Sequence, residues 1–252
     1  MKRVLIAGES WINITTHIKG FDSFQTTTYK EGIQHIRNAF QLAGYEVTHI
    51  PNHLAATEFP DTMEKLEQYD IVALSDIGSN NLLLSQSVFS EGIQKSSKLD
   101  LLYEFVTEKG KGLLMIGGYM SFAGYDGKAR YGETILQKIL PVSVLKYDDR
   151  REFPAGCRPL ICEGKKEHPV LNGIHEWPVI LGYNKTVDDR KDAEVLSTVA
   201  GDPFIAVNEA GKGRCAVFTT DCAPHWCTEE FLKWEGYNRL WKNMAKWLTH
   251  CE

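Results

Sequence analysis

The sequence has no apolar run long enough to cross a membrane and no stripe of basic residues. Its 252 residues include 28 lysines and arginines against 33 aspartates and glutamates, and the resulting net charge of −5 is spread along the chain. A membrane-spanning helix needs roughly 18 to 20 apolar residues, and nucleic-acid binding needs clustered positive charge. The opening MKRVLIAG is too short for a signal peptide. We therefore expect a soluble, cytoplasmic protein with neither a membrane nor a nucleic-acid partner.

The sequence also lacks the short motifs that commonly hold metals and nucleotides. Its six cysteines include no C-x-x-C pair. The segment after the first apolar run contains neither G-x-G-x-x-G nor G-x-x-x-x-G-K-[ST]. A chain of this length without an export signal does not need disulfides. We therefore expect reduced thiols, no cofactor and no metal.

The first half of the sequence alternates short apolar runs with longer amphipathic stretches. Continuously apolar runs rich in β-branched residues are typical of strands buried on both faces. Such runs predict strands over residues 2–8, 45–50, 70–76 and 112–118. Helical spacing of apolar residues predicts helices over 29–44, 61–68 and 98–110. The repeated order of strand, helix and strand indicates a mostly parallel sheet with helices on both faces.

After Pro141 the sequence changes to closely spaced strand-like segments that predict an extension of the sheet. These segments cover residues 142–149, 157–164, 179–189, 193–201 and 203–221. Residues 229–248 predict a closing helix with an aromatic stripe in the core or at an interface. The stripe comprises Phe231, Trp234, Tyr237, Trp241, Met244 and Trp247 or Leu248. With no repeat or linker, we expect residues 1–252 to form one domain.

Ligands of open parallel sheets bind beyond the carboxyl ends of the strands. A long segment, residues 9–28, follows the first predicted strand and is interpreted as a loop that contributes Glu9, Trp11 and His17 to a ligand site. Packing of this loop over the sheet or a neighbouring subunit is the alternative. Asp76 and a Ser/Asn-rich turn follow the third strand, where they either hold an anion or form a solvated loop.

The stretch LLMIGGYMSFAGYDG, residues 113–127, has the pattern of a nucleophile elbow, a sharp turn from a strand into a helix. Gly117 and Gly118 permit a tight turn, and Tyr119 falls at its centre. A phenol with a pKa of about 10 is a poor nucleophile at neutral pH. Ser121 is an alternative nucleophile, although a helix would direct it away from the point of attack.

A second candidate segment, TTDCAPHW, follows the last apolar strand and presents His225 at another strand end. Asp221 and Glu235 are the nearest carboxylates that could orient this histidine or bind a ligand. A histidine that only hydrogen-bonds to the backbone is the alternative. Two further readings are a metal site made by Cys222, His225 and Cys227 and a Cys227 thiol activated by His225.

The whole chain resembles the "putative glutamine amidotransferase-like" family, which is related to the class I glutamine amidotransferases. The resemblance is carried by GESW, GGYMSF, EHPVLNGI and TTDCAPHWCTEEFLKWEGYNRLWKNMAKWL. It implies a flavodoxin-like three-layer sandwich. Class I enzymes have G-x-C-x-G at the elbow and a later H-x-E. Here Tyr119 stands for the cysteine, His225 matches the histidine and Cys227 replaces the glutamate, so the resemblance does not carry over glutamine hydrolysis.

The residues and the resemblance together predict a site for a polar small molecule, such as a sugar or an amino-acid derivative. Its apolar walls are Trp11, Tyr119 and Trp226, and its polar groups are Glu9, Asp221 and His225. Secondary contacts fall to His17, Ser121 and Glu235. If the protein is an enzyme, we expect a hydrolase or transferase with His225 as general base. The alternative is a non-catalytic homo-oligomer in which the long first loop and the closing helix form the interface.

Overall fold

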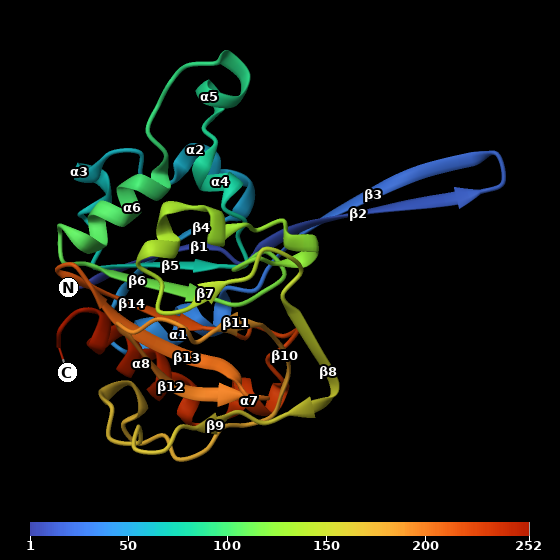
Figure 1. Cartoon of the computed structure of the whole chain (residues 1–252). Coiled ribbons are helices and arrows are strands. Elements are labelled where there is room, and N and C mark those ends of the chain that lie inside the picture. Colours follow the sequence, from blue (N-terminus) through green and yellow to red (C-terminus); the bar gives the residue numbers. More distant parts are fainter. Residues whose placement is uncertain (252) are drawn as a thin grey trace.

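The computed structural model describes residues 1–251 and contains a twisted eight-stranded sheet between two layers of helices (Figure 1). Five neighbouring strands are parallel, and their order has the 2-1-3-4-5 pattern of flavodoxin-like folds. They are β4 (Glu46–Ile50), β1 (Arg3–Gly8), β5 (Ile71–Ser75), β6 (Gly112–Ile116) and β14 (Gly213–Phe218). The four strands predicted for the first half are confirmed.

Three antiparallel strands extend the sheet beyond β14, which confirms the predicted strand-rich extension. They are β13 (Asp202–Ala210), β12 (Ala193–Val199) and β9 (Leu160–Ile161). Two small antiparallel pairs lie outside the main sheet. These pairs join β8 (Arg150–Cys157) to β10 (Ile180–Asn184) and β7 (Ser143–Val144) to β11 (Thr186–Val187). The sequence analysis missed β8, whose Pro154 and Gly156 weaken the strand pattern.

Successive side chains of the central strands pack against opposite helical layers, which explains why these strands are continuously apolar. In β1, Val4 and Ile6 join one core cluster, whereas Leu5 and Ala7 join the other. The first layer contains α1 (Gln34–Leu42), α7 (Glu229–Lys233) and α8 (Gly236–Leu248). The second contains α2 (Ala55–Glu58), α3 (Met63–Leu66), α4 (Asn80–Leu83) and α6 (Lys98–Thr107). Helix α5 (Gln86–Glu91) stands away from the body, beyond α4 (Figure 1).

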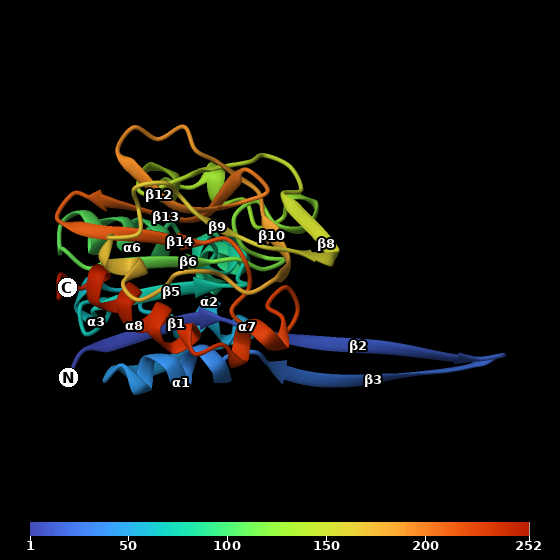
Figure 2. The same cartoon turned by 90° about the horizontal axis from the view of Figure 1, so that it is seen from below.

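The predicted loop over residues 9–28 is wrong, because this segment forms a β-hairpin. Strands β2 (Ser10–Lys19) and β3 (Asp22–Glu31) pair over their whole length and project from the body in both views (Figures 1 and 2). Isoleucines and threonines favour extended backbone, and Gly20, with a φ of +64°, forms the turn with Phe21. Because β3 extends to Glu31, helix α1 begins at Gln34 rather than at Tyr29.

The predicted closing helix is two helices that meet at a corner. The backbone of Trp234 is extended, with a φ of −63° and a ψ of 134°, and ends α7. The Trp234 indole then packs on Gly236, where an added Cβ would lie 2.0 Å from the ring. Of the two placements expected for the aromatic stripe, core or interface, the structure shows the core. Phe231, Tyr237 and Trp241 are at most 3% exposed. No helix within residues 1–251 is long and apolar enough to cross a membrane.

Gly117 provides a test of how closely the end of β6 packs against the end of β14. A Cβ at this position would lie 2.2 Å from the carbonyl oxygen of Thr219, which is held by a hydrogen bond from the Asn184 amide. We expect Gly117→Ala to lower the free energy of unfolding by about 3 kcal/mol. The matched control is Gly44→Ala, because Gly44 has a φ of +89° but no atom within 4 Å of the added methyl, and its loss should be about 1 kcal/mol. Equal losses in urea denaturation would contradict this account.

Candidate functional site

Three carboxyl groups meet where neighbouring parallel strands end. Glu9 follows β1, Asp76 follows β5 and Asp221 lies three residues beyond β14. Glu9 and Asp76 have φ values of 46° and 45°, so both strands kink sharply at these residues. The amide of Glu9 donates to the carbonyl of Ser75 over 2.9 Å, which holds the two kinks side by side. The strand ends at this edge therefore carry three carboxyl groups that act on one another electrostatically.

Glu9 is the most deeply buried of these acids, with 2% of its surface exposed. Its Oε1 accepts a hydrogen bond from the Ser75 hydroxyl over 2.9 Å. Burial, followed by the negative charges of Asp221 and Asp76, raises the pKa of Glu9 well above its ordinary value. The carboxyl group fits only because residue 32 is glycine, where a Cβ would lie 2.4 Å from Glu9 Oε2. Glu9 therefore has a higher proton affinity than an exposed glutamate.

Asp76 connects the acidic cluster to the turn after β6. Its Oδ1 accepts a hydrogen bond from the Met120 amide over 2.7 Å. Burial and the charge of Asp221 raise the pKa of Asp76 to about 6. The Asp76 amide donates to the hydroxyl of Ser121, and that hydroxyl donates to the carbonyl of Ile116. Ser121 is buried and fully engaged in this contact, so the structure gives it a positioning role rather than that of a nucleophile.

Asp221 and His225 form a pair at the end of β14. The Asp221 Oδ2 lies 3.3 Å from the His225 Nδ1, and its Oδ1 accepts from the amide of Ala223. The hydrogen bond that His225 donates to Asp221 raises the pKa of His225 above its usual 6.5, against the opposing effect of burial. The side chain of His225 is 40% exposed, whereas that of Asp221 is 9% exposed. An Nδ1–H bonded to Asp221 leaves Nε2 to face a ligand.

Two aromatic rings flank His225. Tyr119 meets it edge to face with ring centroids 4.6 Å apart, and Trp226 stacks on it with centroids 5.1 Å apart. Glu152 of β8 joins the two rings, because it accepts from the Tyr119 hydroxyl over 2.9 Å and from the Trp226 indole over 3.0 Å. The Arg150 guanidinium lies 4.7 Å from the centre of the Tyr119 ring. The predicted neighbours Tyr119, His225 and Trp226 are therefore brought together.

Tyr119 is poorly suited to attack a substrate. Burial and the hydrogen bond to Glu152 raise its pKa above the ordinary value for a phenol. Its hydroxyl is already used to hold Glu152. Its ring lies against the imidazole of His225.

The turn around Tyr119 differs from the predicted elbow, because no α-helix follows it. The Gly117 amide donates to the carbonyls of Phe218 and Thr220, and the Gly118 amide donates to the Asn184 side chain. Asn184 in turn donates to Asp149, a buried carboxylate that also accepts from the amides of Ala123 and Gly124. The amides of Gly117 and Gly118 are therefore bonded to groups that fix an irregular loop. They do not form the helix N-terminus that would stabilise an oxyanion.

The remaining predicted residues are scattered. Trp11, at the base of the hairpin, and Asp76 line a hollow of about 320 Å³ together with Ser10, Asn52 and Met120. His17 is paired with Phe24 near the turn of the hairpin and stacks on its ring, apart from the cluster around His225. Glu235 begins α8 and lines another hollow with Gly173 and Arg239 rather than the His225 site.

The predicted alternative of a metal held by Cys222, His225 and Cys227 does not match the cluster that the fold assembles. Within residues 1–251, the potential ligand atoms of Glu9, Asp221 and Cys222 are the ones that lie within 4.8 Å of one another. Burial raises the pKa values of Cys222 and Cys227 well above the ordinary thiol value. Protonated thiols are weak ligands and weak nucleophiles. Activation of Cys227 by His225 is therefore disfavoured.

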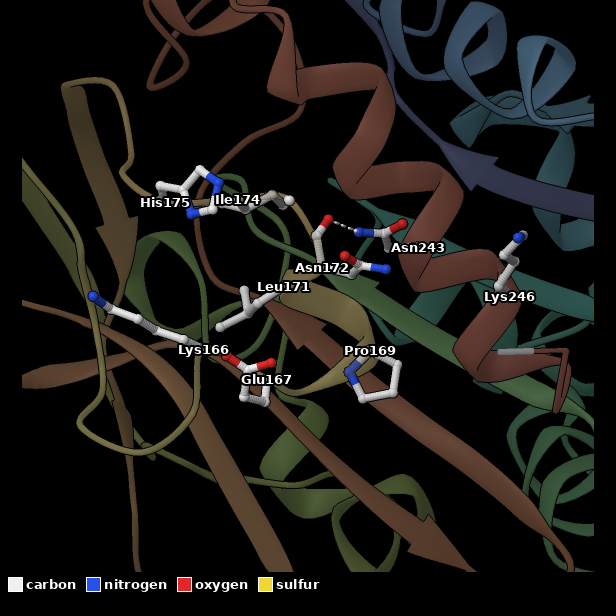
Figure 3. A pocket seen from close by; sticks show the side chains of 10 residues that line it. Lys166, Glu167, Pro169, Leu171, Asn172, Ile174, His175, Asn243 and Lys246 are labelled. Carbon is white, nitrogen blue, oxygen red and sulfur yellow. Dashed lines mark hydrogen bonds between the residues drawn. The ribbon is translucent and has the colours of Figure 1, made fainter.

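Another hollow lies away from the acidic edge, between α8 and the connection over residues 166–175, which includes the short helix Pro169–Leu171. Figure 3 shows that residues from these two segments surround it, and the Asn243 side chain donates to the Asn172 carbonyl over 2.8 Å. Its volume is about 520 Å³, and its charged lining consists of Lys166, Glu167 and Lys246. The sequence patterns did not indicate this hollow, because its residues come from an irregular connection and one helix face.

Comparison with known proteins establishes the family. The family described as "Putative glutamine amidotransferase" matches residues 3–250. The chain belongs to this family. Two similar solved structures are the cytoplasmic proteins STM3548 from Salmonella typhimurium and STM1381 from Salmonella typhimurium LT2. The first is 40% identical over 97% of this chain and 98% of its own, and the second is 39% identical over 98% and 99%; both have a TM-score of 0.92.

A more distant structure supports the fold alone. It is described as a "Putative thua-like protein" from Parabacteroides merdae ATCC 43184 and is 12% identical, with a TM-score of 0.55 over 98% of this chain and 89% of its own. No match was found among curated proteins. The family assignment agrees with the resemblance carried by the turn after β6 and by the segment after β14.

The raised pKa of Asp76 predicts a definite pH dependence of stability. An acid whose pKa rises from 3.8 to about 6 on folding holds more protons in the native state between these values, so the native state loses stability as pH rises through this window. Asp76→Asn removes this loss and can keep the hydrogen bond from Met120. Relative to wild type, the variant should gain about 1 to 3 kcal/mol between pH 4 and pH 7 in urea titrations.

The matched control is Asp61→Asn. Lys65 and Lys95 lower the pKa of Asp61 to about 2 in the folded protein. Asp61 is therefore largely ionised in both the folded and the unfolded protein above about pH 4.5. The difference between this variant and wild type should stay constant from pH 4.5 to pH 7. A constant difference for Asp76→Asn as well would contradict the raised pKa of Asp76.

Proposed function

We propose that the strand-end cluster binds a polar small molecule and does not hydrolyse glutamine. The observation that carries this proposal is the Asp221–His225 pair, whose imidazole is accessible between two aromatic rings. The position of the family nucleophile is occupied by Tyr119, with its hydroxyl bound to Glu152. A general base is thus present without an attacking side chain beside it.

The charges around His225 restrict the substrate class. Asp76, Asp221 and Glu152 lie close to His225, and the Arg150 guanidinium is paired with Asp148 through a bidentate contact. Acidic surroundings repel anions and favour neutral or cationic groups. Hydroxyl or ammonium groups could bond to the carboxylates while the Tyr119 and Trp226 rings pack on the apolar face of the ligand. A sugar or an amino-acid derivative without a phosphate fits this description.

If the protein is an enzyme, His225 acts as the general base of a hydrolase or transferase. A water molecule or substrate hydroxyl would lose its proton to Nε2, and Asp221 would stabilise the imidazolium that forms. By analogy with the two relatives named cytoplasmic proteins, we place this activity in the cytoplasm.

A thermal-shift screen of uncharged and cationic metabolites tests the proposal. A ligand of this site should raise the melting temperature of wild type. The added free energy of unfolding is RT ln(1 + [L]/Kd), about 2.7 kcal/mol at a ligand concentration of 100 times Kd. His225→Ala should abolish most of the shift. His175→Ala is the matched control, since His175 lines the separate hollow of Figure 3 and its loss should leave the shift intact.

The same three proteins, with Tyr119→Phe added, are assayed for the release of glutamate from glutamine. We expect no release from any of them. Turnover by wild type that disappears in Tyr119→Phe or His225→Ala would overturn the claim that glutaminase chemistry is absent. A ligand shift that persists in His225→Ala and vanishes in His175→Ala would place the ligand in the other hollow and contradict the proposed site.

A further inference from the structure

The β2–β3 hairpin forms an arm that extends away from the rest of the molecule. Its ten residue pairs run without a register shift from Ser10 opposite Glu31 to Lys19 opposite Asp22. At about 3.4 Å per residue, the arm is about 34 Å long. Both views show it projecting beyond the carboxyl ends of the sheet with no other element beside its outer part (Figures 1 and 2). An isolated two-stranded ribbon is at best marginally stable in water.

One face of this arm carries three exposed isoleucines and no charged residue along its outer length. Directly opposed residues of an antiparallel pair point to the same face, so the register defines this isoleucine face. It comprises Ile12, Ile14, Thr16, Ile18, Ser23, Gln25, Thr27 and Tyr29. Ile14 and Ile18 are 64% and 76% exposed. Lys19, Asp22 and Lys30 belong to the opposite face. Glu31, opposite Ser10, stands on the isoleucine face only at the base of the arm, so the outer part of this face can be covered without burying a charge.

The edges of the arm also lack the features that keep free strands apart. Exposed edge strands are normally protected by charged residues, prolines or bulges. Between Ile12 and Ile18, and between Ser23 and Tyr29, there is no Lys, Arg, Asp, Glu or Pro, and the pairing is unbroken. Strand-forming threonines occupy these positions instead. The arm therefore has the composition of a segment that is covered in the working protein.

We propose that the arm is a dimerisation element whose isoleucine face lies on a second copy of this chain. The surface area of the arm favours a dimer in which each protomer places its arm on the other. A two-stranded ribbon about 34 Å long and about 10 Å wide presents roughly 340 Å² on one face. A two-fold dimer contains two such contacts, and each protomer buries its own arm and the surface that receives the other arm. This gives roughly 700 Å² per partner, close to the roughly 800 Å² of stable interfaces.

The polar part of the face argues against a lipid surface as the occupant. Thr16, Ser23, Gln25 and Thr27 share the face with the isoleucines, and the arm carries no basic cluster of the kind that binds anionic lipid. Dimerisation would also influence the strand-end cluster, because the arm starts directly after Glu9 and its base residues Trp11 and Ile12 line the hollow beside Asp76. A fixed arm would hold that wall in place.

Sedimentation velocity of the full chain tests the proposal. Wild type should be dimeric, and the double variant Ile14→Lys with Ile18→Lys should weaken the dimer by at least about 100-fold, because it places charges in the apolar contact. The matched control, Thr26→Lys with Thr28→Lys, adds the same charge on the opposite face of the arm and should remain dimeric. Replacing residues 12–29 by Asn-Gly keeps the Ser10–Glu31 pair and should give a monomer. Circular dichroism confirms that each variant is folded.

Three results would overturn the proposal. Wild type could remain monomeric up to about 100 µM, a concentration that would still populate a dimer of weak affinity. The shortened chain could remain dimeric. The two double variants could dissociate equally, which would deny a role to the isoleucine face. A monomeric wild type that binds phosphatidylserine vesicles through the arm would equally overturn it and assign the arm to a membrane.

Discussion

The convergence of three carboxyl groups at one edge of the sheet is the constraint on which the rest of the site depends. Parallel strands end together, so Glu9, Asp76 and Asp221 are forced into proximity by the strand order. Each additional negative charge in a poorly solvated place is costly. The structure compensates by raising the proton affinity of Glu9 and Asp76 and by placing His225 beside Asp221. The fold therefore determines the proton affinities of the acidic groups at this edge.

The surrounding packing serves to hold this edge in place. Gly117 allows the end of β6 to touch the end of β14, and Gly32 leaves room for the Glu9 carboxylate. Asn184 and Asp149, both buried, fix the loop that carries Tyr119. Glu152 then ties Tyr119 to Trp226 on either side of the imidazole. Membership of the putative glutamine amidotransferase family accounts for the scaffold, and these contacts fix the residues around His225 on it.

Several parts of this arrangement could be predicted from the sequence. The buried strands of the first half are marked by unbroken apolar runs, and Glu9, Asp221 and His225 could be placed at strand ends because topology alone locates those positions. The hairpin was mistaken for a loop because isoleucines and polar residues do not alternate regularly along its two strands. The corner at Trp234 was invisible because helical spacing continues through it. Glu152, Asn184 and Asp149 act through long-range contacts, and no local pattern signals such contacts.

The account rests on the electrostatic pairing of Asp221 with His225 at an acidic strand edge. The most direct measurement is an NMR titration of the His225 ring, assigned with His225→Ala, in wild type and in Asp221→Asn. The account predicts a pKa above 6.5 in wild type and a lower pKa in Asp221→Asn, since the variant loses the charged partner. A wild-type pKa below 6.5, or one that does not change in Asp221→Asn, would contradict it.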